Sequence, residues 1–146
     1  ESDLLYWAVR GHGAFKEANG ESRPISAIHH EHDQPDSLVV AISRRQKLEN
    51  LTRRLNPAIH YELIPLGSSS LKSCLVAEGV ADCYVRLGPT GEWDTAAAQC
   101  IVEAAGGRIL SLALQPLSYN ETESLENPDF IVMGDPDLAW GRILAH

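Results

Sequence analysis

Six residues, 38–43, most limit what this chain can fold into, because they are almost wholly apolar and largely β-branched. A strand without polar alternation is typical of a sheet covered on both faces, as parallel strands are when they lie between helices. Further strand-like runs alternate with helix-like segments along the chain. We therefore predict an α/β fold, with a mixed sheet of about five strands covered by helices on both faces.

Strands are predicted over seven runs: 4–9, 14–16, 38–43, 59–64, 81–87, 108–112 and 130–133. Helices are predicted at 45–55, 70–78, 94–105 and 135–144, the last because an Asp-Pro pair suits a helix start. The Gly-His-Gly at 11–13 should form a hairpin-like turn, and residues 19–37, which include two prolines, should form a loop.

Length, charge and cysteine content limit the class of protein. A chain of 146 residues with 44% hydrophobic residues predicts one globular domain over residues 1–146. Its net charge of −8 argues against a nucleic-acid polymer as partner, although a small phosphorylated ligand needs only a few local cations. The three cysteines lack metal-ligand spacing and are expected to be buried free thiols of a cytoplasmic protein. Membrane association is not indicated.

Two predicted helix starts should lie beyond strand ends, where α/β sheets place their ligands. At the first, the serines 68–70 offer hydroxyl and backbone N–H groups for a phosphate, and Lys72 shares their turn. Arg86 ends a predicted strand and could clamp a phosphate with two hydrogen bonds. The alternatives are a helix cap beside a solvated Lys72, and an ion pair of Arg86 with Asp82 or Glu92.

The second helix start is the segment 93–107, in which Asp94 precedes an alanine-rich run that ends at a glycine pair. An acidic residue at a helix start caps free N–H groups, and glycine can adopt the left-handed conformation that ends a helix. On physical grounds alone, this segment is most simply a capped core helix. The preceding loop 88–92 holds Asp94 at a bend, however, and leaves a functional role for its carboxylate open.

Residues 93–97 read Trp-Asp-x-Ala-Ala and are followed by an aliphatic run and Ala-Gly-Gly. This pattern resembles the second signature of the inositol monophosphatase family of metal-dependent phosphatases. Further segments resemble its 3'(2'),5'-bisphosphate nucleotidase branch: 69–79, 88–90, 116–120 and 127–130. The resemblance covers nearly the whole chain but only the C-terminal half of the family's usual length. These residues contain no Asp-Pro-x-Asp-Gly-Thr run, so we expect the N-terminal half, with further metal ligands, to be absent here.

The resemblance implies the C-terminal half of a layered αβαβα phosphatase fold. It also implies Mg²⁺-dependent hydrolysis of the 3'-phosphate of adenosine 3',5'-bisphosphate, for which this chain alone should be inactive. Asp94 would be a catalytic magnesium ligand that also contacts substrate, and Ser69, Lys72 and Arg86 would bind the phosphate and nucleotide. Gln46 stands where the family commonly has a nucleotide-contacting histidine, and its amide could still form a hydrogen bond.

Three other functions stay open. An inositol or fructose phosphate phosphatase of the same family would keep Asp94 but should lack Lys72 and Arg86. A nucleotide-binding module would use Ser69 and Lys72 without magnesium. A structural or partner-binding fragment would expose an apolar face where the absent half docks.

The expected partners are a small phosphorylated nucleotide and the missing N-terminal half. The sequence also leaves open that the protein forms a homo-oligomer. His29, His30 and His32 alternate with acidic residues but lack the spacing of metal ligands, so a solvated loop is expected there. Basic residues within 45–54 should form an exposed helix face.

Overall fold

The structure is a computed structural model that describes residues 5–9, 12–44, 48–67, 69–87, 90–116, 126–127 and 129–144. For residues 69–70, 90–95 and 126–127 it describes the backbone only. No helix in these ranges has the length and hydropathy to cross a membrane.

Within these residues the chain forms strands and short helices in alternation. The strands are β1 (Leu5–Val9), β2 (Gly13–Ala18), β3 (Glu21–Ile25), β4 (Ser37–Ser43), β5 (His60–Leu66), β6 (Cys83–Arg86), β7 (Thr90–Gly91), β8 (Arg108–Ser111), β9 (Glu126–Asn127) and β10 (Phe130–Met133). The helices are α1 (Leu48–Thr52), α2 (Ser69–Ala77), α3 (Glu92–Ala104) and α4 (Trp140–Ile143).

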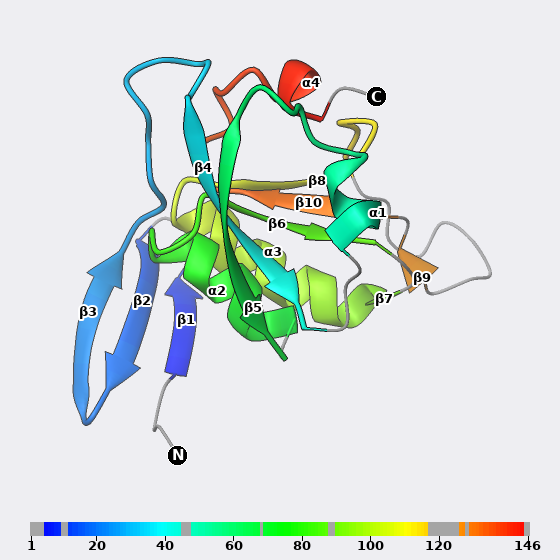
Figure 1. Cartoon of the computed structure of the whole chain (residues 1–146). Helices are drawn as coiled ribbons and strands as arrows, with labels where there is room; N and C mark the ends of the chain where they lie inside the picture. Colours follow the sequence, from blue (N-terminus) through cyan, green and yellow to red (C-terminus); the bar gives the residue numbers. More distant parts are fainter. Residues whose placement is uncertain are drawn as a thin grey trace.

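The strands form two main sheets, with helices between and beyond them (Figure 1). A five-stranded sheet has the order β5-β4-β6-β10-β8, in which β4 is parallel to β5 and β6, while β10 is antiparallel to β6 and β8. A three-stranded antiparallel sheet has the order β1-β2-β3. Helix α3 contacts both main sheets, and α2 contacts the five-stranded sheet. Glu78, the residue after α2, contacts the three-stranded sheet. The predicted mixed five-stranded α/β architecture is confirmed.

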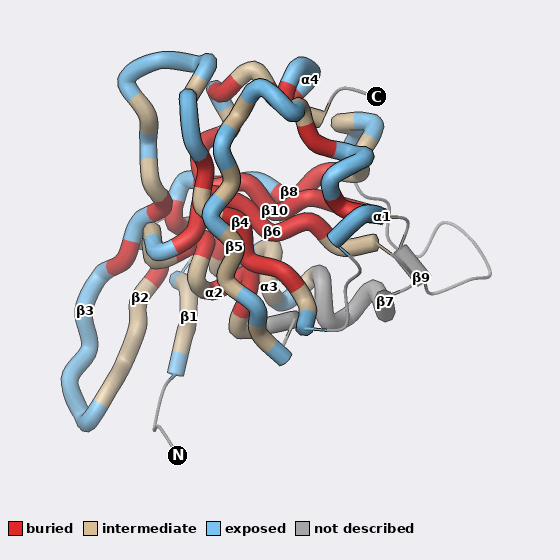
Figure 2. Tube along the Cα trace, in the orientation of Figure 1, coloured by how far each residue is buried: buried red, intermediate tan, exposed pale blue. Residues whose placement is uncertain are grey.

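Strand β4 explains why the sheet must be covered on both faces (Figure 2). Val40 and Ile42 belong to a core cluster that also contains buried residues of α1 and α4. Ala41, between them in sequence, belongs to a second cluster with residues of α2, α3 and the three-stranded sheet. Successive side chains of a strand point to opposite faces, so an apolar run such as this one needs a partner layer on each side.

Strand β3 was not predicted, because it lies inside the segment 19–37 that was expected to be a loop. Four of its five residues are exposed, and its sequence, Glu-Ser-Arg-Pro-Ile, has no apolar alternation. It forms because β2 supplies an antiparallel partner, with Pro24 on an edge strand, where a missing N–H is tolerated.

Two predicted helices are shorter in the structure. Only Leu48–Thr52 of the segment 45–55 is helical among the described residues, followed by turns before Pro57. The predicted helix 135–144 is helical only over Trp140–Ile143. Its expected start is wrong because Asp135 accepts the N–H of Asp137 in a local turn, with its carboxylate held in the interior.

A buried carboxylate attaches the three-stranded sheet to the end of α2. The Glu78 side chain is 4% exposed and accepts hydrogen bonds from the Tyr6 hydroxyl at 2.9 Å and the Lys16 Nζ at 2.8 Å. Arg23 lies 3.6 Å from the same carboxylate. Two hydrogen-bond donors, from β1 and β2, and one ion-pair partner, from β3, therefore fix the sheet against the end of α2.

Candidate active site

Lys72, Arg86 and the starts of two helices lie at one end of the strands of the five-stranded sheet. Strands β4, β5 and β6 are parallel, so their C-terminal ends meet at this end (Figure 1). Helix α2 begins at Ser69, three residues after β5 ends, and α3 begins at Glu92, after β6 and β7. The two helices also pack against each other. Both helix starts therefore lie beyond strand ends, as predicted, where N–H groups are available to an anion.

Lys72 is a buried cation, not the solvated side chain that the sequence left open as an alternative. It is 1% exposed, its Nζ donates to the Leu66 carbonyl at 3.2 Å, and it lies 5.1 Å from the centre of the Tyr84 ring. A lysine has three N–H donors, and the Leu66 carbonyl is the one hydrogen-bond acceptor that the described residues offer it. Burial, and then the charge of Arg86, lower the Lys72 pKa below its ordinary value. A bound anion would offset both effects.

Arg86 lies close enough to Lys72 for its charge to act on that residue. It is half-buried at the end of β6, two residues after the fully buried Tyr84. Side chains two apart share a strand face, so Arg86 and Tyr84 point to the side that α2 and α3 cover. The sequence left open an ion pair of Arg86 with Asp82 or with Glu92. The pair with Asp82 does not form, because Asp82 lies at the other end of the strand and pairs with His30. The side chain of Glu92 lies outside the described residues.

Two of the candidate residues, Asp94 and Ser69, are placed only in part, and a third, Gln46, is not described. The backbone of Asp94 is in the first turn of α3, because the helix begins two residues earlier than predicted. Ser69 is the first residue of α2, as the backbone shows. Gln46 lies outside the described residues, as do the side chains of Asp94 and Ser69. Within the described part of the chain, no three His, Cys, Asp or Glu side chains gather in a way that could hold a metal ion.

The histidine loop is less solvated than predicted. The His30 ring lies 2.7 Å from Asp82, and the His30 N–H donates to Asp135 at 2.7 Å. Asp82 and Asp135 are 6% and 4% exposed, and Asp82 also accepts the N–H of Val39 at 2.7 Å. His29 lies 3.7 Å from Asp135 and is more than half exposed. The loop before β4 is thus fastened to the sheet at the end opposite Arg86.

We expect His30→Ala to lower the free energy of unfolding by about 1–3 kcal/mol, because it leaves the buried Asp82 carboxylate without its side-chain partner. Urea denaturation measures this change. His32→Ala is the matched control, since His32 is exposed in the same loop and should have little effect. Equal stability of the two variants would show that the His30–Asp82 contact contributes nothing.

The cysteines are free thiols, but only two of them are buried. Cys74 and Cys83 lie in the interior, and burial raises the pKa of Cys74 to about 11. Cys100 is exposed on α3, against the prediction that all three are buried. A raised pKa keeps a thiol protonated, so the two interior cysteines are unreactive packing residues.

Comparison with known proteins gives three related matches. The inositol monophosphatase family model matches residues 1–136. The 3'(2'),5'-bisphosphate nucleotidase CysQ of Aggregatibacter actinomycetemcomitans is 41% identical over 138 residues, which are 94% of this chain and 51% of that protein. The protein of the same name from Escherichia coli K12 is 39% identical over 130 residues, which are 89% of this chain and 50% of that protein.

A solved structure also matches. CysQ from Bacteroides thetaiotaomicron, described as a bacterial member of the inositol monophosphatase family, superimposes with a TM-score of 0.74 at 35% identity. The match covers 91% of this chain and 54% of that one. The chain therefore spans about half the length of the curated relatives and of the structure that it matches.

Proposed function

Because the chain belongs to the inositol monophosphatase family, we propose that it is the C-terminal half of a 3'(2'),5'-bisphosphate nucleotidase. The reaction is hydrolysis of the 3'-phosphate of adenosine 3',5'-bisphosphate: water adds to phosphorus, the P–O3' bond breaks, and the nucleotide oxygen takes up a proton. The products are AMP and inorganic phosphate. The names of relatives at 39–41% identity support this activity for the whole protein.

The observation that carries the choice of substrate is the pair of neighbouring cations at the active-site edge. Lys72 is buried, the charge of Arg86 lowers its pKa, and within the described residues Lys72 forms no ion pair with a carboxylate. Two close positive charges repel each other, so they are stabilised most by a ligand with more than one negative group. A bisphosphate nucleotide is such a ligand, whereas a sugar hydroxyl would be served better by an amide or a carboxylate.

The proposed metal site depends on Asp94. The backbone of Asp94 lies in the first turn of α3, and a carboxylate is the donor type that Mg²⁺ prefers. One carboxylate cannot complete an oxygen-rich shell, so the other ligands would come from the N-terminal half. Bound there, Mg²⁺ would supply charge neutralisation at the phosphate and a water of lowered pKa. The residues of this chain would hold and orient the substrate: the N–H groups at Ser69, and the cations Lys72 and Arg86.

An inositol or fructose phosphate phosphatase of the same family is the second candidate. It would need one phosphate contact and several hydroxyl contacts, which Lys72 and Arg86 suit less well.

We place the activity in the cytoplasm because the chain carries free cysteines.

The decisive experiment compares the intact protein with this chain alone. The intact protein should release phosphate from adenosine 3',5'-bisphosphate only when Mg²⁺ is present, and faster than from inositol monophosphate. This chain alone should be inactive, and adding the separately produced N-terminal half should restore turnover. A chain that hydrolyses the nucleotide unaided would contradict the proposed division of the site between two halves. An intact protein that prefers inositol monophosphate would favour the second candidate.

A further inference from the structure

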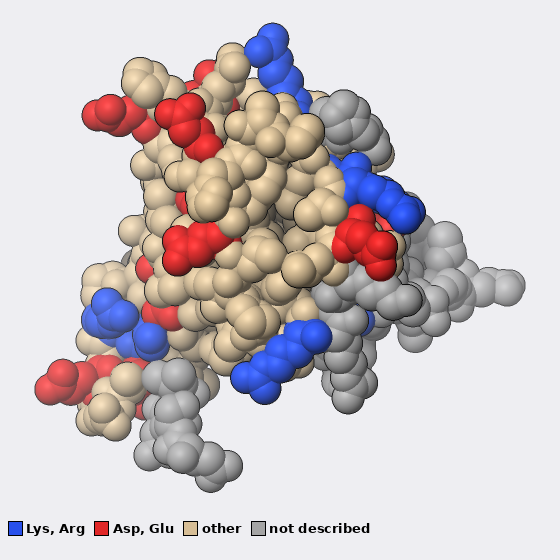
Figure 3. Space-filling view, viewed as in Figure 1, with Lys and Arg blue, Asp and Glu red and all other residues tan. Residues whose placement is uncertain are grey.

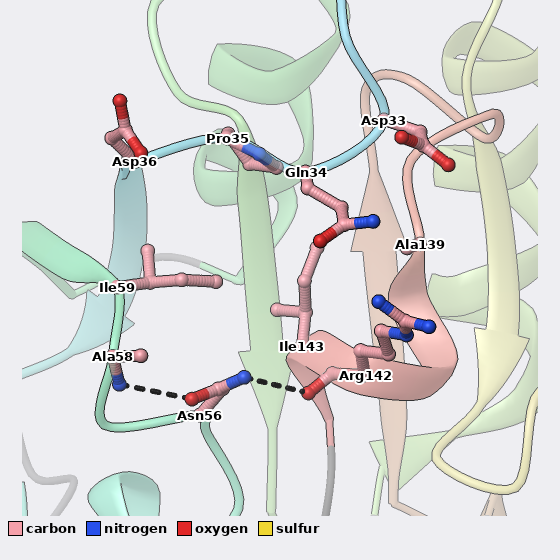
Figure 4. Close-up of a pocket in the computed structure, with 10 residues that line it drawn as sticks. All are labelled: Asp33, Gln34, Pro35, Asp36, Asn56, Ala58, Ile59, Ala139, Arg142 and Ile143. Carbon is pink, nitrogen blue, oxygen red and sulfur yellow. Dashed lines mark hydrogen bonds between the residues drawn. The ribbon is translucent and has the colours of Figure 1, made fainter.

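A pocket of about 200 Å³ lies at the end of the sheet opposite the candidate active site (Figure 4). Its residues come from three segments: 33–36, which precedes β4, 56–59, which precedes β5, and 139–143, which contains α4. It therefore sits at the N-terminal ends of β4 and β5, whereas α2 follows the C-terminal end of β5. The proposed phosphatase site does not include it.

Hydrogen bonds between the three segments hold the pocket walls in place. The Ala139 N–H donates to the Asp33 carbonyl at 2.8 Å, joining the first wall to the third. The Asn56 N–H donates to the Ile143 carbonyl at 2.8 Å, and its side-chain amide donates to the Arg142 carbonyl at 3.3 Å, joining the second wall to the third. The pocket is therefore preformed, which lowers the entropic cost of binding a ligand.

Three charged residues line the pocket, and one of them, Asp36, lies at the side of Ile59 (Figure 4). The side chains of Asp33 and Arg142 lie at the opposite side, with the Gln34 amide pointing between the walls (Figure 4). Both are exposed, and no ion pair joins them. Among the described residues neither has another charged partner. A guanidinium offers a fork of N–H groups that suits a carboxylate, and an aspartate suits an ammonium group.

Apolar groups form the other side. Ala58 and Ile59 lie across the pocket from Asp33, and the buried Ile143 lies between them and Arg142 (Figure 4). The pocket thus places Asp33 and Arg142 at one side, and at the other an aliphatic surface that Asp36 borders. Such a site combines apolar contacts with a few orienting polar groups.

We propose that this pocket binds a small aliphatic α-amino acid. Such a molecule carries its carboxylate and its ammonium group on one carbon, and its apolar side chain on the opposite side of that carbon. The carboxylate would bind the Arg142 guanidinium, the ammonium group would bind Asp33, and the side chain would contact Ile59 and Ile143.

The charge around the pocket favours a ligand with an ammonium group over a simple anion. Glu31, Asp33 and Asp36 are all exposed in the loop before β4, and Figure 3 shows acidic side chains gathered at this end of the molecule. A carboxylic acid without an amine would meet this negative potential with only Arg142 to offset it.

The test is calorimetric titration of the intact protein with L-valine and two analogues that each lack one charge. Isovalerate lacks the ammonium group, and isobutylamine lacks the carboxylate. We expect L-valine to bind with millimolar affinity and both analogues to bind roughly tenfold or more weakly, because each loses a charge-assisted contact. Arg142→Gln and Asp33→Asn should each weaken L-valine binding by a similar factor.

Two variants outside the pocket serve as controls. Arg53→Gln and Asp137→Asn remove exposed charges of the same types and should leave the affinity unchanged. Arg142→Gln removes only an exposed side chain, since its carbonyl accepts the Asn56 bond, so the variant should fold. The proposal is overturned if L-valine shows no binding at tens of millimolar, if isovalerate binds as tightly as L-valine, or if the pocket and control variants bind it equally.

Discussion

Replacing Asp94 with asparagine in the intact protein should lower magnesium-dependent hydrolysis of adenosine 3',5'-bisphosphate by several orders of magnitude. The change removes one negative charge from a proposed Mg²⁺ site that has few carboxylates, while it keeps the size of the side chain. Because an amide binds Mg²⁺ weakly, raising the magnesium concentration should not restore the rate. Phosphate release at saturating substrate and magnesium measures the effect.

The control for Asp94→Asn is Glu103→Gln, which removes a charge from the exposed face of the same helix. It should retain full activity, and both variants should unfold at nearly the same urea concentration. Near-normal turnover by Asp94→Asn at saturating magnesium would exclude Asp94 as a metal ligand. An equal loss in both variants would indicate a general effect of charge on the helix.

The second large effect is expected at the two cations. Arg86→Ala and Lys72→Met should each reduce kcat/KM for the bisphosphate nucleotide roughly tenfold to a hundredfold, because a charge-assisted hydrogen bond contributes about 1.5–3 kcal/mol. The loss should be smaller for inositol monophosphate, which has a single phosphate. Steady-state kinetics with both substrates measures the difference.

Lys72→Met also separates binding from stability. Methionine fills the space of the buried Lys72 side chain but carries no charge. Burial lowers the Lys72 pKa, which means that the folded protein disfavours the charged lysine. The free energy of unfolding should therefore stay the same or rise in this variant, while activity falls. Arg108→Ala, at the exposed start of β8 and at the end of the sheet away from Arg86, is the matched control and should not change the kinetics. Equal losses of kcat/KM on both substrates would contradict the proposal that Lys72 and Arg86 bind a second phosphate.

The sheet could be predicted from sequence because its inner strands are apolar on both faces. The runs at β4, β6 and β10 carry buried residues at consecutive positions, and such a pattern has few other structural solutions. Strand β3 could not be predicted, since its residues are polar and its pairing with β2 is a tertiary contact. The turn at 135–139 could not be predicted either. The buried Asp135 carboxylate accepts the Asp137 N–H there, and a turn forms where a first helical turn was expected.

The positions of the two helix starts beyond strand ends could be predicted, but the environment of the candidate side chains could not. Helix starts after strand ends mark the edge of the sheet, and the alternation within β6 could also have placed Arg86 on the face of Tyr84. The Lys72 side chain contacts the Leu66 carbonyl and the Tyr84 ring, and the Tyr84 contact is a tertiary one that no local pattern indicates. His30 contacts residues 52 and 105 positions away, so no local pattern indicates its partners.

The place of β10 in the sheet has a consequence for how the protein is made. This strand pairs with β6 on one side and β8 on the other, yet it follows both in the sequence. The ribosome therefore synthesises β6 and β8 before β10, the strand that joins them. Until β10 is made, the edge of each strand that will pair with it stays open. The three-stranded meander β1-β2-β3 pairs only neighbours in sequence, so it can form as soon as it emerges. Protection of the nascent chain is therefore needed most between the synthesis of β6 and that of β10.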